Sequence, residues 1–315
     1  MTERVLITGA AGFVGRHLAR HLYEQGLIVH GLDRPSIPVP ADLHIAWHTC
    51  DITHAAQVAA TVGQVQPDYI FHLVALIKSK SLADLLAVNV LGTQNVLDAL
   101  VKVRAKAHVL VTGSAAEYGV AKADELPIRE SHPLRPLSLY GISKVAQGLL
   151  AIQYAYCQHL AVVCTRTFNL VGPGQLPGLV GADFARRIVQ VERSGPKGCI
   201  RVGNLTAQRD FVDVRDAVRA YWLACSQGMP GEVYNVCSGR PVQIEQVLRW
   251  LVEHSTSHIQ VVVDAGPMSS QDVSISFGSA EKLHEATGWQ PAVSLDQSLQ
   301  DLLAERRRVT LTCDE

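Results

Sequence analysis

The sequence lacks the features of proteins that bind nucleic acids or insert into membranes. Its 28 basic and 29 acidic side chains leave a formal charge of −1, so no basic excess indicates an anionic polymer or lipid surface as the partner. No apolar run approaches the ~20 residues of a membrane helix. The run at residues 5–7 is too short for a signal peptide. We therefore expect no nucleic acid and no membrane among its partners.

The sequence also lacks patterned cysteine. No two of its seven cysteines form a CxxC motif, and their number is odd. Scattered cysteines in a long chain are typical of a cytosolic protein that uses thiols as small core residues. Three pairs of histidines have the i,i+4 spacing of zinc ligands on a helix, but no third ligand lies near any pair in the sequence. We expect a cytoplasmic protein without a bound metal.

What the sequence contains is a regular alternation of short β-branched runs and longer segments of helical periodicity. The runs predict buried strands at residues 4–8, 27–32, 69–74, 108–112 and 161–167, with a weaker candidate at 47–50. Amphipathic periodicity between them predicts helices at residues 14–25, 55–65 and 82–103. This alternation predicts the α/β class, with a Rossmann-type doubly wound parallel sheet and helices on both faces.

The alternation loosens after about residue 168. Turn residues become frequent, and further helices are predicted near residues 243–253 and 295–306. We therefore predict a doubly wound domain over residues 1–168. A later segment, at about residues 209–236, is expected to return to this domain. A smaller mixed α/β region over residues 169–315 would bind the substrate.

A glycine-rich loop joins the first predicted strand to the first helix. It reads Gly9-Ala-Ala-Gly12-Phe-Val-Gly15. Gly9 permits a tight turn, Gly12 lets backbone N–H groups approach a pyrophosphate, and Gly15 lets the helix pack closely. The helix N-terminus adds unpaired N–H groups and the positive end of its dipole. A loop of this kind between a strand and a helix predicts that residues 1–168 bind NAD or NADP.

Two residues after the second predicted strand bear on the choice between NAD and NADP. Asp33 stands about 20 residues after the loop, where a carboxylate accepts hydrogen bonds from the adenosine ribose and repels a 2′-phosphate. Arg34 follows, and its guanidinium would instead bind that phosphate. Both cofactors therefore stay open, with NAD favoured.

A tyrosine and a lysine four residues apart lie at the start of a predicted helix. In Tyr140-Gly-Ile-Ser-Lys144 the spacing places the phenol and the ammonium on one face, with Ser138 as the expected N-cap. The ammonium would stabilise the phenolate and lower the pKa of Tyr140, so that the phenol exchanges a proton with a carbonyl oxygen. Ser114, at the end of a predicted strand, would hydrogen-bond the same oxygen. We predict that Ser114, Tyr140 and Lys144 are the catalytic residues.

With these motifs, the chain resembles the extended short-chain dehydrogenases/reductases that act on nucleotide sugars. Within that family it is most similar to the GDP-4-keto-6-deoxy-mannose reductases. The resemblance covers nearly the whole chain, and the stretches that carry it are residues 133–147, 167–175, 202–216, 234–239 and 287–291.

The resemblance implies roles in cofactor binding for the matching positions. Lys144 would also hold the nicotinamide ribose, and Asp51 would contact the adenine. Asn89 would support the active-site end of the cofactor, although capping a turn is a simpler role for it. Further implied cofactor contacts are Phe13, Val14, Ile52, Leu73, Val74, Ala75 and Phe168.

The resemblance also implies how a nucleotide-diphosphate sugar would bind. Asn169 and Arg209 would bind the diphosphate, which a planar guanidinium pairs with bidentately. Pairing of Arg209 with Asp210 or Asp213 is the alternative. The chain departs from the reductases at Ser269, where they carry a further arginine for the diphosphate. It also departs at residues 72–78. The resemblance implies that this segment passes near the nicotinamide, so different substrate contacts are expected there.

Residues 114–119 indicate which reaction the resemblance implies. Related 4,6-dehydratases carry a glutamate that acts as the catalytic base where this chain has Ala116. Glu117 is one residue later, and on an extended segment its side chain would point to the opposite face. Dehydration is therefore not expected. The implied reaction is NAD(P)H-dependent reduction of the C4 ketone of a nucleotide-diphosphate 4-keto-6-deoxy sugar. GDP-4-keto-6-deoxy-mannose is favoured as substrate, with Tyr140 as proton donor.

Two other functions stay open. A nucleotide-sugar 4-epimerase would use the same three catalytic residues while keeping its NAD bound. A non-catalytic dinucleotide-binding protein would use the fold alone. In related proteins, the helices at about residues 82–103 and 140–159 form the four-helix bundle of a dimer. Their apolar stripes predict a homodimer here or, alternatively, a larger core.

Overall fold

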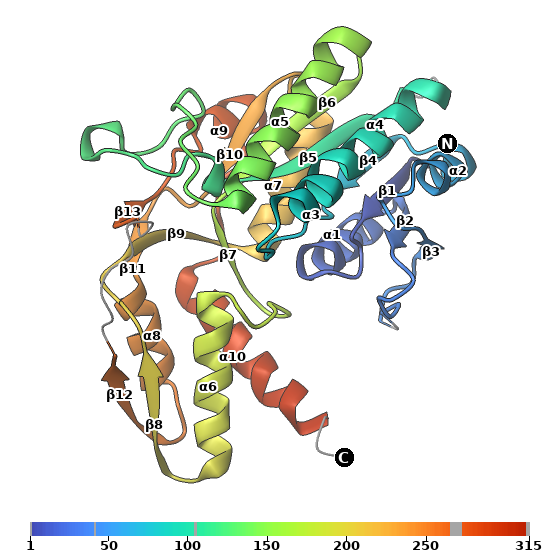
Figure 1. Ribbon diagram of the computed structural model, residues 1–315. Helices are drawn as coiled ribbons and strands as arrows, with labels where there is room; N and C mark the ends of the chain where they lie inside the picture. The colour runs from blue at the N-terminus through green and yellow to red at the C-terminus, as the bar shows by residue number, and fades with distance from the viewer. Residues whose placement is uncertain (1, 41, 104–105, 265–272, 313–315) are drawn as a thin grey trace.

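Seven parallel strands form the central sheet of the protein (Figure 1). The computed structural model describes residues 2–40, 42–103, 106–264 and 273–312. The strand order is β10-β6-β5-β4-β1-β2-β3, and every neighbouring pair runs parallel. The strands are β1 (Arg4–Thr8), β2 (Ile28–Asp33), β3 (Ala46–Thr49), β4 (Tyr69–His72), β5 (His108–Ser114), β6 (Ala161–Thr167) and β10 (Val233–Val236). The predicted α/β class with a doubly wound sheet is confirmed.

Helices cover both faces of this sheet (Figure 1). Side chains alternate across a strand, so Val5 and Ile7 of β1 pack with one set of helices and Leu6 packs with the other. Burial on both faces explains why these strands read as continuous apolar runs. The first set is α1 (Phe13–Glu24), α7 (Val214–Gln227) and α9 (Glu281–Thr287), and the second is α2 (Ala55–Val65), α4 (Gly92–Val103) and α5 (Leu139–Gln158).

The helix predicted at residues 82–103 is helical throughout but not uniform. It consists of α3 (Leu82–Leu86), a π-helical turn (Ala87–Leu91) and α4. A π-helical turn contains one more residue than an α-helical turn and is often found at functional sites. Here the turn contains Asn89, a polar side chain with no exposed surface. The interruption therefore coincides with one of the residues predicted to support the cofactor.

The order of strands reverses between β1 and β4. The chain runs from β1 outward through β2 to β3, then returns to the other side of β1 and continues through β4, β5 and β6. In doubly wound sheets, ligands bind outside the carboxyl ends of the strands at such a point. The loops after β1 and β4 meet there, and the Leu73 N donates to the Thr8 O at 3.2 Å.

The remaining elements form a second region beyond the sheet (Figure 1). Its helices α6 (Val180–Ser194), α8 (Ile244–Glu253) and α10 (Leu295–Thr312) share one apolar cluster with β8 and β9. Its short strands, which the sequence did not predict, are β7 (Asn169–Val171), β8 (Lys197–Val202), β9 (Gln208–Asp213), β11 (Pro241–Gln243), β12 (His258–Val263) and β13 (Ile275–Ser276). The predicted helices at residues 243–253 and 295–306 correspond to α8 and α10. The division of the chain at residue 168 stays a prediction.

The chain returns from this region to the central sheet through α7 and β10. Trp289 donates from Nε1 to the Asp216 O at 3.0 Å. The carboxylate of Asp216 accepts from the N atoms of Ala292 and Val293 at 2.9 and 2.8 Å. The stretch at residues 287–291 thus ties the C-terminal part to α7. In the part of the chain that the structure describes, no helix combines the length and apolar content needed to cross a membrane.

Candidate active site

The glycine loop after β1 has a geometry that explains each of its glycines. Gly9 has a φ of +75°, which glycine adopts at low cost. A Cβ on Gly15 would lie 2.2 Å from the Gly9 O and 2.6 Å from the Ala10 Cα, so only glycine lets α1 start this close to the loop. Gly12 is different: its φ of −71° and ψ of 172° suit any residue, and a Cβ there would meet only the Gly9 O, at 3.2 Å. The absence of a side chain at Gly12 therefore leaves space on the outer side of the loop rather than inside the protein.

The start of α1 fits the phosphates of a dinucleotide. Gly12 is the N-cap residue, and no side chain caps the helix. The first N–H groups of α1 can therefore donate to an acceptor outside the protein. The positive end of the helix dipole favours a negatively charged acceptor, such as a phosphate. Phe13 and Val14, two of the predicted cofactor contacts, are the first residues of the helix and are half-buried.

Three polar residues predicted to bind adenosine follow β2 and β3. The Oδ2 of Asp33 accepts from the Ala11 N at 2.9 Å, which ties the end of β2 to the glycine loop, and burial raises the pKa of Asp33. Arg34 is exposed. Asp51 accepts at Oδ1 from the N and Oγ1 atoms of Thr53 at 2.9 and 2.7 Å, and these bonds lower the pKa of Asp51. The structure places these residues at the sheet edge that carries the glycine loop.

The segment after β4 is held in place by Asn89. Residues 73–75 are half-buried, and Val74 lies against Gly9. Asn89 accepts from the Leu76 N at 2.7 Å and donates to the Leu76 O at 3.0 Å and to the Ser143 Oγ at 2.9 Å. Its amide therefore links this segment to α5, so its support for a cofactor would be indirect.

The predicted catalytic residues meet where β5 ends and α5 begins. A Cβ on Gly141 would lie 2.5 Å from the Ala116 O, so the start of α5 packs closely on the turn that follows β5. The Ser138 Oγ accepts from the Gly141 N at 3.0 Å, which confirms the predicted N-cap. Tyr140 lies on this first turn, near enough for the Ser114 hydroxyl to influence its pKa. The sheet and the helix thus bring the two hydroxyls together.

The expected lowering of the Tyr140 pKa is wrong for this structure. Burial raises the pKa of Tyr140 to about 12, although the hydrogen bond with Ser114 opposes the rise. The Lys144 Nζ lies 5.9 Å from the centre of the tyrosine ring and donates instead to the Thr112 O at 2.7 Å and the Gln147 Oε1 at 2.6 Å. A phenol with this pKa is protonated at neutral pH, as a proton donor must be.

Lys144 begins a chain of buried hydrogen bonds that the sequence did not reveal. Gln147, which accepts from it, donates to the Thr93 Oγ1 at 2.8 Å, and that oxygen lies 2.9 Å from the His72 Nε2. Burial lowers the pKa of His72 to about 3, so its ring is neutral. Lys144 is 2% exposed, and burial lowers its pKa to about 8. The ammonium is held by neutral acceptors under the active site.

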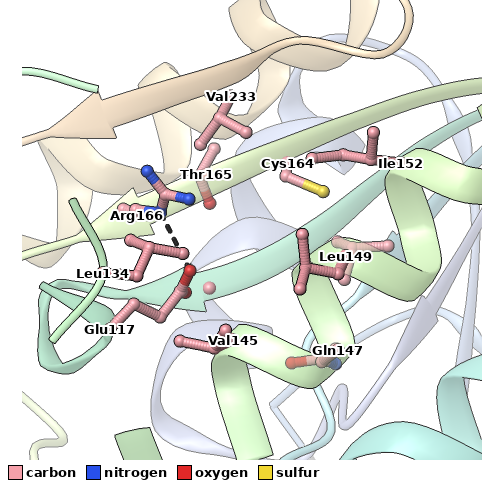
Figure 2. A pocket seen from close by; sticks show the side chains of 13 residues that line it. Glu117, Leu134, Val145, Gln147, Leu149, Ile152, Cys164, Thr165, Arg166 and Val233 are labelled. Atoms are coloured by element: carbon pink, nitrogen blue, oxygen red, sulfur yellow. Dashed lines mark hydrogen bonds and ion pairs between the residues drawn. The ribbon is translucent and has the colours of Figure 1, made fainter. Parts of the chain in front are cut away.

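Glu117 lies on the inner side of the same site. The prediction of an extended segment at this point is wrong, because Ala115–Glu117 forms a turn of 3-10 helix. Its carboxylate accepts from the Ser114 N at Oε1 and from the Arg166 Nε at Oε2, both at 2.8 Å, and Figure 2 shows it facing Arg166. Both its oxygens are engaged inside the protein.

Two cavities contain predicted site residues. One, of about 660 Å³, is lined by Tyr140 and by Lys78. The other, of about 420 Å³, is lined by Asn169, Arg209 and Gly178. The Lys78 Nζ donates to the Gly178 O at 3.2 Å. Lys78 therefore lies where the two cavities adjoin. The segment that ends at Lys78 departs from the reductases in sequence, but its residue pattern predicted no role for Lys78 itself.

The predicted diphosphate residues both face the smaller cavity. Asn169 donates from Nδ2 to the Asp210 O at 3.0 Å. The Asp210 carboxylate accepts from the backbone N atoms of Ser238 and Gly239. Asp213 pairs with Arg215 at 2.8 Å. Asp210 and Asp213 thus each have other partners, and the role of Arg209 stays a prediction. Ser269 lies outside the described residues.

Two predicted cofactor contacts lie in apolar packing. Ile52 is 5% exposed and fills the space beside Gly92. Phe168 is 4% exposed and packs in a cluster with Tyr118, Ile128 and Cys237. Their part in cofactor binding stays a prediction, as do the roles of the other site residues.

Comparison with known proteins identifies what this arrangement is similar to. The model of the NAD dependent epimerase/dehydratase family matches residues 5–237. A GDP-6-deoxy-D-mannose reductase of Pseudomonas aeruginosa is 31% identical over 314 residues, covering 97% of each chain.

Two solved structures share the fold over almost the whole chain. The structure of RMD from Pseudomonas aeruginosa complexed with NADPH superposes with a TM-score of 0.87 and 30% identity, covering 98% of this chain and 100% of that one. A UDP-glucose 4-epimerase from Thermus thermophilus in complex with NAD gives a TM-score of 0.83 and 28% identity, covering 96% and 99% of the two chains.

Proposed function

The chain belongs to the NAD dependent epimerase/dehydratase family, and we propose that it reduces the C4 ketone of a nucleotide-diphosphate 4-keto-6-deoxy sugar. Membership confirms the predicted enzyme class and the predicted nicotinamide cofactor. GDP-4-keto-6-deoxy-mannose is the favoured substrate, because the chain is similar over its whole length to a GDP-6-deoxy-D-mannose reductase.

The observation that carries the proposal is that Tyr140 and Ser114 meet where β5 ends and α5 begins. Burial holds the pKa of Tyr140 at about 12, so the phenol carries the proton that a reductase must deliver. When bound, the reduced nicotinamide supplies the hydride to C4. Tyr140 donates its proton to the oxygen that becomes an alkoxide, while the Ser114 hydroxyl orients that oxygen. The positive charge of Lys144 stabilises the phenolate that remains on Tyr140.

The substrate would span the two cavities. The sugar would lie in the cavity beside Tyr140 and the nucleotide in the cavity beside Asn169 and Arg209. The diphosphate then crosses the junction where Lys78 lies. Lys78 would thus supply a positive charge to the diphosphate, a charge that the reductases obtain from an arginine where this chain has Ser269.

NAD is the proposed preferred dinucleotide. The carboxylate of Asp33 lies next to the glycine loop, where it would accept from the ribose hydroxyls and repel a 2′-phosphate. The NADPH in the Pseudomonas structure belongs to that protein. Assays with both cofactors therefore belong in the first experiment.

The proposal is tested by absorbance at ~340 nm, which follows reduced nicotinamide. Purified protein is mixed with NADH or NADPH and with GDP-4-keto-6-deoxy-mannose made in situ. We expect a rapid loss of absorbance that the Tyr140→Phe variant does not show. Tightly retained NAD without net consumption of NADH would instead identify a 4-epimerase, and unchanged turnover in Tyr140→Phe would refute the mechanism.

A homodimer is also proposed, with an interface along α4 and α5. Three side chains seven residues apart on α5 are exposed, and this spacing places them in one stripe: Ile142 at 41%, Leu149 at 59% and Tyr156 at 65%. An apolar stripe of this kind is typical of a helix that packs against another copy. Leu91, in the π-helical turn directly before α4, is a further exposed apolar side chain, at 54%.

The cytoplasm is the proposed location of the protein. The six cysteines that the structure describes are free, and free thiols persist in a reducing compartment. Cell fractionation followed by immunoblotting would test this, and recovery in a secreted or periplasmic fraction would contradict it.

A further inference from the structure

Glu117 is a buried carboxylate that the proposed reaction does not use directly. It is 2% exposed. One oxygen accepts from the backbone N of Ser114 and the other from the Arg166 Nε, both at 2.8 Å (Figure 2). Each oxygen faces a donor, and a protonated carboxyl group would turn its own hydrogen toward one of them. Burial raises the pKa of Glu117, yet the species that fits both donors is the anion.

The surrounding sequence makes room for this carboxylate. A Cβ on Gly113 would lie 2.3 Å from the Glu117 Oε1, so any other residue there would displace it. Gly148 on α5 also faces it, with a Cβ position 3.7 Å from the Oε2. The backbone of β5 and the face of α5 thus leave space where the carboxylate lies.

Folding alone does not account for the Glu117–Arg166 pair. Its side chains are 3% and 10% exposed, and removing two charges from water costs about as much free energy as their attraction returns. Apolar side chains of similar size would stabilise a fold at least as well. The pair therefore calls for a role beyond stability.

Lys144 is the functional group that this charge acts on. Its hydrogen bonds go to uncharged acceptors, the Thr112 O and the Gln147 Oε1. The Lys144 ammonium and the Glu117 carboxylate are thus bonded to residues 112 and 114 of the same strand.

The other titratable groups around Lys144 do not supply a negative charge. Tyr140 on α5 and Cys164 on β6 are protonated at neutral pH, because burial raises the pKa of each to about 12. His72 on β4 is neutral, with a pKa lowered to about 3. Arg166 on β6 is positive and is paired with Glu117. Among the described residues that act on Lys144, Glu117 is the anion.

Water does not weaken this interaction appreciably. Glu117, Gln147 and Arg166 line a small cavity (Figure 2) of about 10 Å³. A water molecule requires roughly that volume, so the cavity holds one at most. Two charges separated by protein rather than by solvent interact more strongly.

We propose that Glu117 is a positioning residue of the active site, whose carboxylate fixes the Ser114 backbone and sustains the positive charge of the buried Lys144. Through Ser114 it orients the hydroxyl that meets the substrate oxygen. Through Lys144 it maintains the charge that stabilises the Tyr140 phenolate. The catalytic part of this role rests on the proposed function.

The test compares Glu117→Gln with Glu192→Gln. Glutamine offers one acceptor oxygen, so one of the two donors to residue 117 loses its partner, and the negative charge is removed. Glu192 is a matched control on α6, because its carboxylate also accepts from a backbone N–H, that of Thr256, and from an arginine, Arg307. Its side chain is 8% exposed, and it lies in the second region of the molecule.

The measurement is the pH dependence of the NADH dissociation constant, with that of turnover beside it. In the wild type, binding and turnover should both fall as Lys144 loses its proton near pH 8, its lowered pKa. Removal of a nearby negative charge lowers the pKa of an ammonium, so Glu117→Gln should move this alkaline limb down by roughly one pH unit. Glu192→Gln should lose thermal stability and keep the limb of the wild type. If the Glu117→Gln profile coincides with the wild-type profile, the proposal is overturned.

A second variant separates charge from packing. Glu117→Asp keeps the negative charge on a shorter side chain, so its limb should stay within a few tenths of a pH unit of the wild-type position even if turnover falls. A limb that moves as far as in Glu117→Gln would overturn the role of the charge. Because NADH binding requires no sugar, a shifted binding limb without turnover would refute the proposed function and leave this inference standing.

Discussion

Gly12 provides a test of whether the loop after β1 binds a dinucleotide. Its dihedral angles are open to any residue, and a Cβ would contact only the Gly9 O, at 3.2 Å. Nothing inside the protein therefore requires glycine. Gly12→Ala should leave the fold intact and should place a methyl group where the phosphates approach the start of α1.

The expected magnitudes follow from this geometry. Alanine is a poorer N-cap residue than glycine, so the free energy of unfolding should fall by less than about 1 kcal/mol. A charge-assisted hydrogen bond between a backbone N–H and a phosphate contributes roughly 1.5–3 kcal/mol. Loss of one such bond should raise the dissociation constant of NADH or NADPH roughly 10- to 150-fold.

Gly15→Ala is the matched comparison, because its Cβ would lie 2.2 Å from the Gly9 O. It should lower the free energy of unfolding by at least about 1–3 kcal/mol, the usual cost of overpacking. The assay is titration of nicotinamide fluorescence, with thermal unfolding of each variant. Wild-type affinity in a folded Gly12→Ala protein would refute the assignment of this loop to the phosphates.

Further predictions concern turnover, pH, substrate affinity and assembly. Tyr140→Phe should reduce turnover ~10²- to 10⁴-fold while leaving NADH affinity unchanged, and a reduction in affinity alone would contradict its role as proton donor. Turnover of the wild type should fall above about pH 8, because burial has lowered the pKa of Lys144 to that value and its charge is lost as the pH rises through it; constant turnover up to pH 10 would contradict this. Lys78→Met should raise the KM for the nucleotide sugar about tenfold, equivalent to about 1.4 kcal/mol, with little effect on kcat. Lys197→Met, at an exposed lysine on β8, should leave the KM unchanged. Equal KM values in the two variants would contradict a role of Lys78 in binding the diphosphate. Leu149→Glu should convert the dimer to a monomer in light scattering after size-exclusion chromatography, and an unchanged mass would contradict an interface on α5.

Local patterns in the sequence were sufficient to predict most of the central sheet. The bounds of β1, β6 and α2 were predicted to the residue, because a strand buried on both faces has a continuous apolar run and a covering helix has a clear period. Ser138 was predicted as the N-cap of α5 because its side chain acts on a neighbour three residues away.

Features that depend on distant contacts were not predicted. The π-helical turn around Asn89 depends on Leu76 and Ser143, which belong to other elements. The short strands of the second region have two to six residues, and segments this short carry little periodicity. They are defined by the strands with which they pair rather than by their own sequence.

The state of the active site also depended on contacts that spacing does not show. The interval between Tyr140 and Lys144 correctly placed both on one helix, yet their pKa values follow from burial and from acceptors such as the Thr112 O. Glu117 was expected on an extended segment, where it would face away from the site. The turn at Ala115–Glu117 directs it instead to Arg166, which lies 49 residues away in the sequence.

The position of β10 has a consequence for the synthesis of this protein. β10 pairs with β6, but residues 168–232 separate the two strands and must be translated first. Until then, β6 is a buried-type strand whose open edge can pair with other chains. The nascent chain therefore passes through a stage, before the ribosome reaches residue 233, in which it depends on chaperones or on rapid translation to avoid aggregation. Ribosome-bound chains that end before residue 233 should associate with holdase chaperones more than chains that extend past residue 236.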